Sequence, residues 1–513
     1  MKKLNRNNNQ GLHPLMTYVL LILGTIVISG FLHILDAQAT FQKINSVTLE
    51  LLPETEVVNS LFNLSGIKYI FTNTVSNFAN FTVLSNLIIL LMGISIMDKS
   101  GFLQTAITLT TKKMKKKTVT FIFVLLCVLS SIFGNLSYLI FIPLGALLFY
   151  YGKRNPAIGI ISSFAALSCG SGINMIFTSS DSTLLNYTRL AAQTINSNVV
   201  ITNLAFMFIM VVSVLLISYI ITVVTENIIV KKLPRYEFTE RELEEDIVTK
   251  GEQKGMVYAC GSALVYILIF IYNIIPGLPL SGALLDNSQT IYIDKLFSVN
   301  SFFSNGFVFI ISVLFVILGL SYGIGAKTIT NNKEFINSLS HSLNGIGKVL
   351  VMIFAASTFI SIFKQTNIGN FLVASFTNII NNSTFSGLPL LILVFVISAL
   401  STIFLPSSLS KWSILASVVV PKLMNLGITP EFAQIVFRFG ESTMMGLTPV
   451  FAYFIVYIAY LDIYSQNEKS LKLSETIKYQ SSYAIVVSLV LLALIIIWYI
   501  IGLPIGINST VGL

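Results

Sequence analysis

Three ionisable side chains stand inside apolar stretches of this chain. Asp181 follows Asn174 by seven residues in a segment rich in glycines and hydroxyls, and Arg438 precedes Glu441 by three residues in a second such segment. Ionisable residues at membrane depth are energetically expensive and usually functional. A carboxylate in such a place can carry a proton or hold a cation, and a guanidinium can bind a substrate carboxylate through two parallel hydrogen bonds.

Each of these residues also has a structural alternative. The side chain of Asp181 would cap a helix that begins at Ser182 by accepting hydrogen bonds from backbone N–H groups. Arg438 and Glu441 would form a static ion pair one helical turn apart. The residues alone leave both alternatives open.

The composition requires lipid as the solvent for much of the chain. Of the 513 residues, 54% are hydrophobic and 10% are charged, whereas a soluble domain carries about 25% charged residues. The basic residues behind the net charge of +9 gather in short runs between apolar stretches, such as KKMKKK at 112–117. Such runs are typical of cytoplasmic loops beside anionic lipid, so we predict a lipid bilayer as partner and no nucleic acid.

The sequence gives little support to an enzyme. The three cysteines and three histidines form no cluster with metal-ligand spacing, and no HExxH motif occurs. We therefore predict no catalytic residue, no enzymatic activity and no cofactor apart from a coupling ion. A passive channel is a further alternative, but the ionisable residues Asp181, Arg438 and Glu441 favour coupled transport.

Several stretches reach the roughly 20 apolar residues that a membrane helix needs. The clear spans are 15–35, 203–224, 256–277, 307–326 and 484–505, with shorter runs near 83–97 and 347–363. Segment 118–152 is too long for one span and has basic residues at both ends, which predicts a hairpin that enters from the cytoplasm and turns at Gly134–Ser137. Two full spans joined by a tight outside turn are the alternative.

Two further segments are apolar at both ends and polar in the middle. The first, 156–196, contains LSCGSGINMIFTSSDST, and the second, 430–460, contains FGESTMMGLTP. Non-helical backbone at membrane depth is tolerated only inside protein or beside a water-filled cavity. We therefore predict that each segment is a broken helix that lines such a cavity.

The two halves of the chain resemble each other weakly. IPLGALLFYYGKRNP at 142–156 resembles VPKLMNLGITP at 420–430, and CGSGIN at 169–174 parallels FGEST at 439–443 in the same order. Inverted repeats with broken helices are a common plan of secondary transporters. The sequence predicts an all-α polytopic membrane protein with about nine transmembrane helices, two re-entrant hairpins and inverted repeats.

The expected organisation places the N-terminus in the cytoplasm and the C-terminus outside, in the inner (plasma) membrane. In chain order we expect a cytoplasmic N-terminus (1–14), a first transmembrane helix (15–35), an external loop (36–82), a first repeat (83–225, with hairpin 118–152 and broken helix 156–196), a cytoplasmic loop (226–254), two linking helices (255–326) and an inverted second repeat (347–505, with hairpin 388–427 and broken helix 430–460).

Four stretches resemble the p-aminobenzoyl-glutamate transporter (AbgT) family. They begin with YLIFIPLGALLFYYG at 138, FTSSDSTLLNYTRLAA at 177, FAASTFISIFKQTNIG at 354 and SKWSILASVVVPKLMNLGITP at 410. The resemblance implies a homodimer that moves p-aminobenzoyl-glutamate or related aromatic carboxylates, or expels sulfonamides, with proton or sodium coupling. A carrier of other small organic anions, such as dicarboxylates, remains the alternative.

The resemblance and the residues together give two groups of candidates. The substrate-binding candidates are Asn174, Ser410, Trp412 and Arg438, and the ion-coupling candidates are Asn135, Asp181, Ser407 and Glu441. The Trp412 ring could stack on an aminobenzoyl group, with plain packing as its alternative. A sodium ion is expected, if anywhere, near Asn135 and Asn174, because hard cations take oxygen ligands.

The chain departs from the family pattern at four positions of the second half. It has Thr402 and Met445 where the family usually has Asn, Pro406 where it has Gly, and Glu441 where it has Asp. The loss of two asparagine side chains weakens the expectation of sodium in this half and leaves the exact substrate open.

Overall fold

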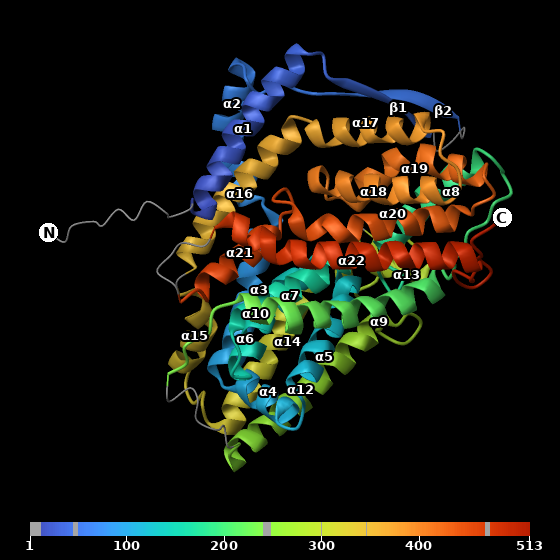
Figure 1. Ribbon diagram of the computed structural model, residues 1–513. Coiled ribbons are helices and arrows are strands. Elements are labelled where there is room, and N and C mark those ends of the chain that lie inside the picture. The colour runs from blue at the N-terminus through green and yellow to red at the C-terminus, as the bar shows by residue number, and fades with distance from the viewer. Residues whose placement is uncertain (1–11, 45–49, 240–247, 299, 345, 467–471) are drawn as a thin grey trace.

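The chain folds as an all-α polytopic membrane protein in this computed structural model (Figure 1). The structure describes all residues except 1–11, 45–49, 240–247, 299, 345 and 467–471. Most of the predicted cytoplasmic N-terminus (1–14) and part of the predicted loop 226–254 therefore lie outside the described residues.

Eight helical stretches among the described residues are long and apolar enough to cross a membrane. They are Pro14–Ile34, Leu64–Lys99, Lys116–Phe133, Met207–Lys232, Lys250–Ile274, Phe302–Ala326, Gly347–Gln365 and Leu473–Ile501. Four further apolar helices are shorter, Leu136–Tyr151, Pro156–Cys169, Leu388–Phe404 and Phe454–Ile463.

The segment predicted as an external loop, 36–82, is more structured than expected. It contains an antiparallel pair of strands, β1 (Gln38–Ile44) and β2 (Leu51–Val57), followed by helix α2 (Leu64–Ala79). The Asn63 side chain caps α2 by accepting a hydrogen bond from Gly66 N at 2.7 Å. Helix α2 then runs into α3 (Thr82–Lys99), so the apolar helical stretch begins well before residue 83.

The first half of the chain turns back on itself at Gly134. Helix α5 (Lys116–Leu129) continues into the 3-10 turn η1 (Ser130–Phe133), and α6 (Leu136–Tyr151) returns beside it. Gly134 has φ +58°, a left-handed value that side chains with a Cβ rarely adopt. Helix α7 (Pro156–Cys169) then ends, and α8 (Ser179–Gln193) begins after a nine-residue interruption at 170–178.

The second half has the same order of elements. Helices α18 (Leu388–Phe404) and α19 (Ser408–Met424) form a hairpin, and α20 (Pro430–Met444) with the 3-10 turn η4 (Met445–Leu447) precedes a break and α21 (Phe454–Ile463). Further elements are α1 (Pro14–Ile34), α4 (Phe102–Thr111), α9 (Met207–Val224), the π-turn η2 (Thr225–Ile229), α10 (Val230–Lys232), the 3-10 turn η3 (His341–Leu343), α16 (Gly347–Gln365), α17 (Ile368–Asn382) and α22 (Leu473–Ile501).

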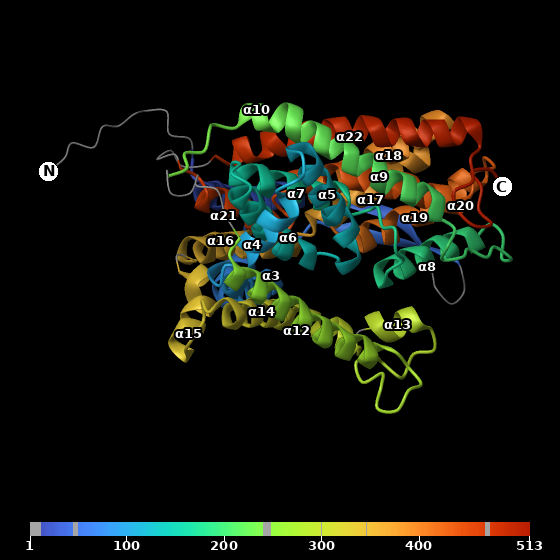
Figure 2. The same cartoon turned by 90° about the horizontal axis from the view of Figure 1, so that it is seen from below.

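Helices α12 (Lys250–Ile274), α13 (Tyr292–Phe297), α14 (Phe302–Ala326) and α15 (Asn332–Ser340) form a layer of their own. Figure 2 shows this layer on one side of the other helices, with α3 between them. Helix α14 packs on both α12 and α3, and α3 in turn contacts α6. This layer is therefore attached to the helices that carry the hairpins chiefly through α3, with smaller contacts to α4 and between α13 and α8.

Glycines let each hairpin pack closely against the neighbouring broken helix. A Cβ on Gly159 of α7 would lie 2.0 Å from the carbonyl oxygen of Gly145 in α6. A Cβ on Gly440 of α20 would lie 2.4 Å from the carbonyl oxygen of Phe395 in α18. These approaches leave no room for a side chain, so they fix the position of each hairpin relative to the adjacent helix break.

Candidate functional site

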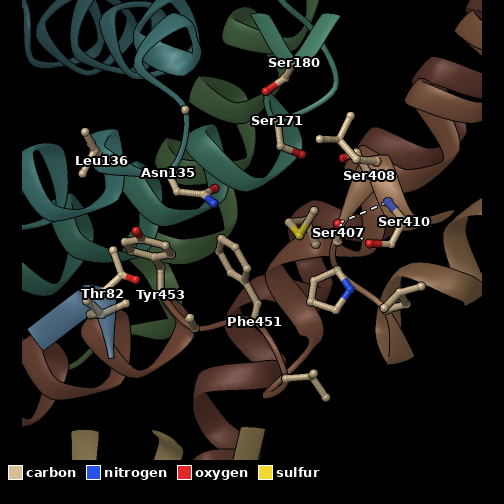
Figure 3. Close-up of a pocket in the computed structure, with 18 of the residues that line it drawn as sticks. Thr82, Asn135, Leu136, Ser171, Ser180, Ser407, Ser408, Ser410, Phe451 and Tyr453 are labelled. Carbon is tan, nitrogen blue, oxygen red and sulfur yellow. Dashed lines mark hydrogen bonds between the residues drawn. The ribbon is translucent and has the colours of Figure 1, made fainter. Parts of the chain in front are cut away.

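A cavity of about 1170 Å³ is lined by both halves of the chain (Figure 3). Its wall includes the turn of each hairpin, at 131–136 and 405–410. It also includes residues of each helix break, among them Asn174 and 450–453. Segments far apart in the sequence thus meet around one space, as expected for a site built by two repeats with broken helices.

The wall of this cavity combines polar groups, aromatic rings and positive charge. Its hydroxyl and amide groups come mainly from Asn77, Asn80, Asn135, Ser171, Asn174, Ser180, Ser361, Asn367, Ser407, Ser408 and Ser410, and its rings from Phe133, Phe303, Phe307, Phe451 and Tyr453. Among the described residues, Lys364 and Arg438 line it, and no Asp or Glu does. The cavity therefore favours an anionic ligand with an aromatic part.

Asp181 and Arg438 form an ion pair that joins the two halves. The Arg438 Nη1 group of α20 donates to Asp181 Oδ1 of α8, and both side chains are about 5% exposed. The Asn174 amide also donates to both Asp181 oxygens, at 3.3 and 3.2 Å. Arg438 lines the cavity whereas Asp181 lies behind it.

Asp181 does take part in a helix cap, but the helix begins three residues earlier than predicted. Helix α8 begins at Ser179, and its N-cap is Thr178. The Thr178 backbone N–H and hydroxyl donate to Asp181 Oδ2 at 2.9 and 2.7 Å, and Asp181 N donates to Thr178 Oγ1 at 3.3 Å. Asp181 thus closes a capping box from the third helical position and binds Arg438 at the same time.

The predicted alternative of a static Arg438–Glu441 pair is wrong, since Glu441 has a different partner. The Lys411 Nζ atom of α19 lies 3.0 Å from Glu441 Oε2, and it donates to Thr402 Oγ1 at 2.6 Å. The contact with Glu441 is an ion pair without the alignment of a hydrogen bond. The Lys411 and Glu441 side chains are 0% and 1% exposed.

Sequence reasoning missed Lys411 as a functional candidate. Its signal was a lysine directly before Trp412, near the start of a hairpin arm within the membrane. Two of the four departures, Thr402 and Glu441, are the partners of this lysine. The other two, Pro406 and Met445, line the cavity.

Trp412 is enclosed by protein and does not line the cavity. Its indole Nε1 donates to Thr188 Oγ1 at 2.8 Å, and Thr188 in turn donates to Gln434 Oε1 at 2.6 Å. The ring stacks on Phe437 with 4.5 Å between centroids. In this conformation the indole packs helix α19 against α8 and α20, and no cavity ligand can reach it.

The remaining four candidates all line the cavity. Ser407 accepts a hydrogen bond from Ser410 N at 3.3 Å, and the two hydroxyls lie 2.9 Å apart. Asn135 is exposed at the first hairpin turn, and Asn174 Oδ1 is buried without a hydrogen-bond partner. Asn174 therefore offers a free oxygen acceptor. Among the described residues no three His, Cys, Asp or Glu side chains group as metal ligands.

One serine pattern that can mark a hydrolase nucleophile does occur, GLSYG at 319–323. It lies in the interior of helix α14. The nucleophile of that motif instead requires a sharp turn between a strand and a helix. The pattern is therefore part of an ordinary helix here.

Comparison with known proteins gives one family over the whole chain. The profile of the AbgT transporter family matches residues 1–513. The p-aminobenzoyl-glutamate transport protein of Escherichia coli K12 is 25% identical over 98% of this chain and 94% of its own length.

Two solved structures are also similar. The YdaH transporter of Alcanivorax borkumensis is 24% identical, covering 96% of this chain and 100% of its own, with a TM-score of 0.48. MtrF of Neisseria gonorrhoeae, described as illuminating a class of antimetabolite efflux pumps, is 27% identical over 98% of both chains, with a TM-score of 0.47. Because the family profile matches the chain along all of its 513 residues, the chain belongs to the AbgT transporter family.

Proposed function

We propose that this chain is a secondary active transporter of p-aminobenzoyl-glutamate or related aromatic carboxylates, driven by a proton or sodium gradient. The observation that carries this proposal is the charge of the cavity wall, where Lys364 and Arg438 stand without a lining carboxylate among the described residues. A substrate with two carboxylates would find the Lys364 ammonium there and, once Asp181 releases it, the Arg438 guanidinium. The name of the relative from Escherichia coli supports the same substrate class.

The aromatic part of such a substrate would pack among the rings of the cavity wall. Phe133 is 41% exposed and stacks on Phe307 at 4.9 Å between centroids, so one of its faces is open to a ligand. Phe451 and Tyr453 present two more rings from the second helix break (Figure 3). Offset or edge-to-face packing of this kind adds about 0.5–1.5 kcal/mol beyond burial. These rings take the role that the sequence suggested for Trp412.

The Asp181–Arg438 pair offers a route to coupling. While Asp181 is ionised, it occupies the Arg438 guanidinium. A proton on Asp181 would weaken this pair and free the guanidinium to bind a substrate carboxylate from the cavity. A sodium ion near Asn135 and Asn174 is the alternative coupling ion, and the free Asn174 Oδ1 oxygen is compatible with it.

The orientation and assembly belong to the same proposal. The lysine runs at 112–117 and 231–232 favour a cytoplasmic location for those connections, which puts the N-terminus inside and the C-terminus outside. A homodimer in the plasma membrane follows from the family resemblance. Export of sulfonamide-type antimetabolites is compatible with the same cavity.

Uptake of labelled p-aminobenzoyl-glutamate into proteoliposomes tests the proposal. A pH gradient and a sodium gradient are imposed separately on the wild type, Asp181→Asn, Arg438→Gln and the control Arg189→Gln, an arginine of α8 outside the cavity wall. We expect driven uptake, its loss in Asp181→Asn, and an apparent KM raised about ten- to hundredfold in Arg438→Gln. Absence of uptake by folded protein under both gradients would rule out this substrate and favour dicarboxylates.

A further inference from the structure

An ion pair sealed from the cavity lies between helices α18, α19 and α20, ahead of the second helix break. Lys411 Nζ has Thr402 Oγ1 at 2.6 Å and Glu441 Oε2 at 3.0 Å, and none of these three residues lines the cavity. The Phe437 ring lies beneath the ammonium, with 5.8 Å from Nζ to the centroid. The ammonium is therefore surrounded by one carboxylate, one hydroxyl and one ring face, all of which attract a cation.

A fully buried ammonium is expensive, because the loss of hydration outweighs much of its attraction to one carboxylate. Long lysine side chains usually avoid this cost by extending to an aqueous boundary. Lys411 instead extends to Glu441, although Ser410 beside it lines the cavity. The Lys411 side chain points into the protein and contacts two oxygen atoms there. This arrangement indicates a site that requires a positive charge.

Few other ionisable groups are near enough to take over this role. The elements that pack against α19 carry Lys43 on β1, Asp181, Tyr187 and Arg189 on α8, and Glu431, Arg438 and Glu441 on α20; α17 and α18 carry none, and α19 itself adds Lys422. Asp181 and Arg438 pair with each other. Lys422 binds the backbone carbonyls of Ile380 and Ser383, both at 2.6 Å. Glu441 thus faces Lys411 as its own counter-ion.

We propose that the Lys411 ammonium is a resident cation between helices α18, α19 and α20, in the place beside Glu441 that a sodium ion would otherwise occupy. Coupling through this site then uses a proton in place of sodium. The proposal rests on the proposed transport function and sharpens it, since that function left the coupling ion open. It also gives a physical reason why Thr402 stands where the family usually has Asn and Glu441 where it has Asp. The threonine hydroxyl and the longer glutamate side chain fit around the Lys411 ammonium, which supplies the positive charge.

The proton cycle needs no further reactant. When movement of the turn at 405–410 admits water, the Lys411 ammonium releases one proton to that water, and the electron pair of the N–H bond stays on nitrogen. The neutral amine takes up one proton again when the site opens to the opposite side. The Lys411 site carries one proton across the membrane in each cycle, in addition to any proton taken up by Asp181, and no sodium ion is bound at Glu441.

The first arm of the test does not depend on the substrate. Thermal unfolding of the purified full chain is measured in sodium chloride and in choline chloride at equal ionic strength. The variants are Glu441→Gln, Lys411→Asn, the double variant Lys411→Asn/Glu441→Gln, and Lys68→Asn, which makes the same change at an exposed lysine of α2. Subtracting the sodium-induced shift of Glu441→Gln removes the contribution of sodium bound elsewhere, for example near Asn174.

We expect the sodium-induced shift of the wild type to be the same as that of Glu441→Gln and of Lys68→Asn. Lys411→Asn should gain an additional upward shift in sodium, because an amide oxygen replaces the ammonium beside the carboxylate, and Glu441→Gln should cancel this gain. A wild-type sodium shift that Glu441→Gln removes would overturn the proposal, because sodium would then already bind at Glu441.

The second arm measures uptake of p-aminobenzoyl-glutamate with a pH gradient in sodium-free choline buffer. It uses the wild type and Lys411→Met/Glu441→Met, in which both charges are removed together so that folding is retained. We expect driven uptake by the wild type and its loss in the double variant. Undiminished pH-driven uptake by the folded double variant would overturn the proposal. If the wild type transports nothing, the substrate assignment fails, and the sodium-shift arm still decides the role of Lys411.

Discussion

Helix α20 carries two charged side chains three residues apart, and the structure places them in two different ion pairs. Arg438 binds Asp181 of the first half, at the wall of the cavity. Glu441 binds Lys411 of the same half, in a position with 0–1% exposure. The first pair joins the two repeats, and the second lies wholly within one repeat.

This difference decides what each pair can exchange with. A ligand in the cavity can compete with Asp181 for the Arg438 guanidinium, since Arg438 lines that space. No cavity ligand can touch Lys411 or Glu441 without movement of the hairpin turn at 405–410. The cross-repeat pair is thus placed to respond to the substrate, and the sealed pair to respond to a small ion or a proton.

The largest effect on stability should come from breaking the sealed pair. Lys411→Met leaves the Glu441 carboxylate buried without a counter-ion, and the loss of one partner of a buried pair typically costs about 3–5 kcal/mol. Thermal or denaturant unfolding of the purified protein in detergent would measure this. The matched control is Lys411→Met/Glu441→Met, which removes both charges and should recover most of the loss. If the single and double variants are equally destabilised, the pair is not isolated from water as the structure indicates.

A smaller loss of stability is expected from Asp181→Asn in the cross-repeat pair. The Asn side chain keeps hydrogen bonding to Thr178 and Asn174 but loses the charge-assisted bond to Arg438, worth about 1.5–3 kcal/mol. Water in the cavity can then solvate part of the guanidinium. The contrast between the two ion pairs is tested by dividing this loss of unfolding free energy by the loss measured for Lys411→Met. A double-mutant cycle with Arg438→Gln would show whether the two side chains couple at all, and a coupling near zero would contradict the ion pair.

Features set by neighbouring residues could be predicted from the sequence, whereas contacts between residues far apart in the chain could not. The interruptions at 170–178 and 448–453 were foreseen because glycine and hydroxyl clusters stand inside apolar stretches, which is a local signal. The Asp181–Arg438 pair was not foreseen, because its partners are 257 residues apart and each also had a plausible local role. A local rule instead suggested Arg438 with Glu441, and tertiary packing overrode it.

Lys411 and Trp412 show the same limit in a single dipeptide. The sequence points to Trp412, because it matches the tryptophan of the family's hairpin and its ring can stack on an aromatic ligand. The fold buries both side chains and gives the indole to Thr188 and the ammonium to Glu441. Whether a side chain of a hairpin arm points to the cavity or into the protein depends on the rotation of that helix against its neighbours, which no single sequence displays.

Thr178→Val tests how much the capping box contributes to the cross-repeat pair. The change removes the hydroxyl that donates to Asp181 Oδ2 at 2.7 Å and accepts from Asp181 N. Loss of an N-cap side chain typically costs about 0.5–2 kcal/mol. We expect a drop of that size in unfolding free energy together with weaker substrate uptake, because Asp181 is held less firmly against Arg438. Thr183→Val, an exposed threonine of the same helix, is the matched control and should change neither quantity.

The smallest effect is expected from Trp412→Phe. This variant tests whether the indole next to the Lys411–Glu441 pair only packs the helices together and never contacts the substrate. The change keeps the stacking on Phe437 and removes the indole donor to Thr188 Oγ1. Thr188 remains bonded to Gln434 Oε1, so the expected cost is that of one hydrogen bond, about 0.5–1.5 kcal/mol, with the KM for p-aminobenzoyl-glutamate unchanged. Unfolding and uptake are measured on the same preparation. A raised KM without a change in stability would mean that the indole reaches the substrate in another conformation, and the sealed region would then have to open to the cavity during transport.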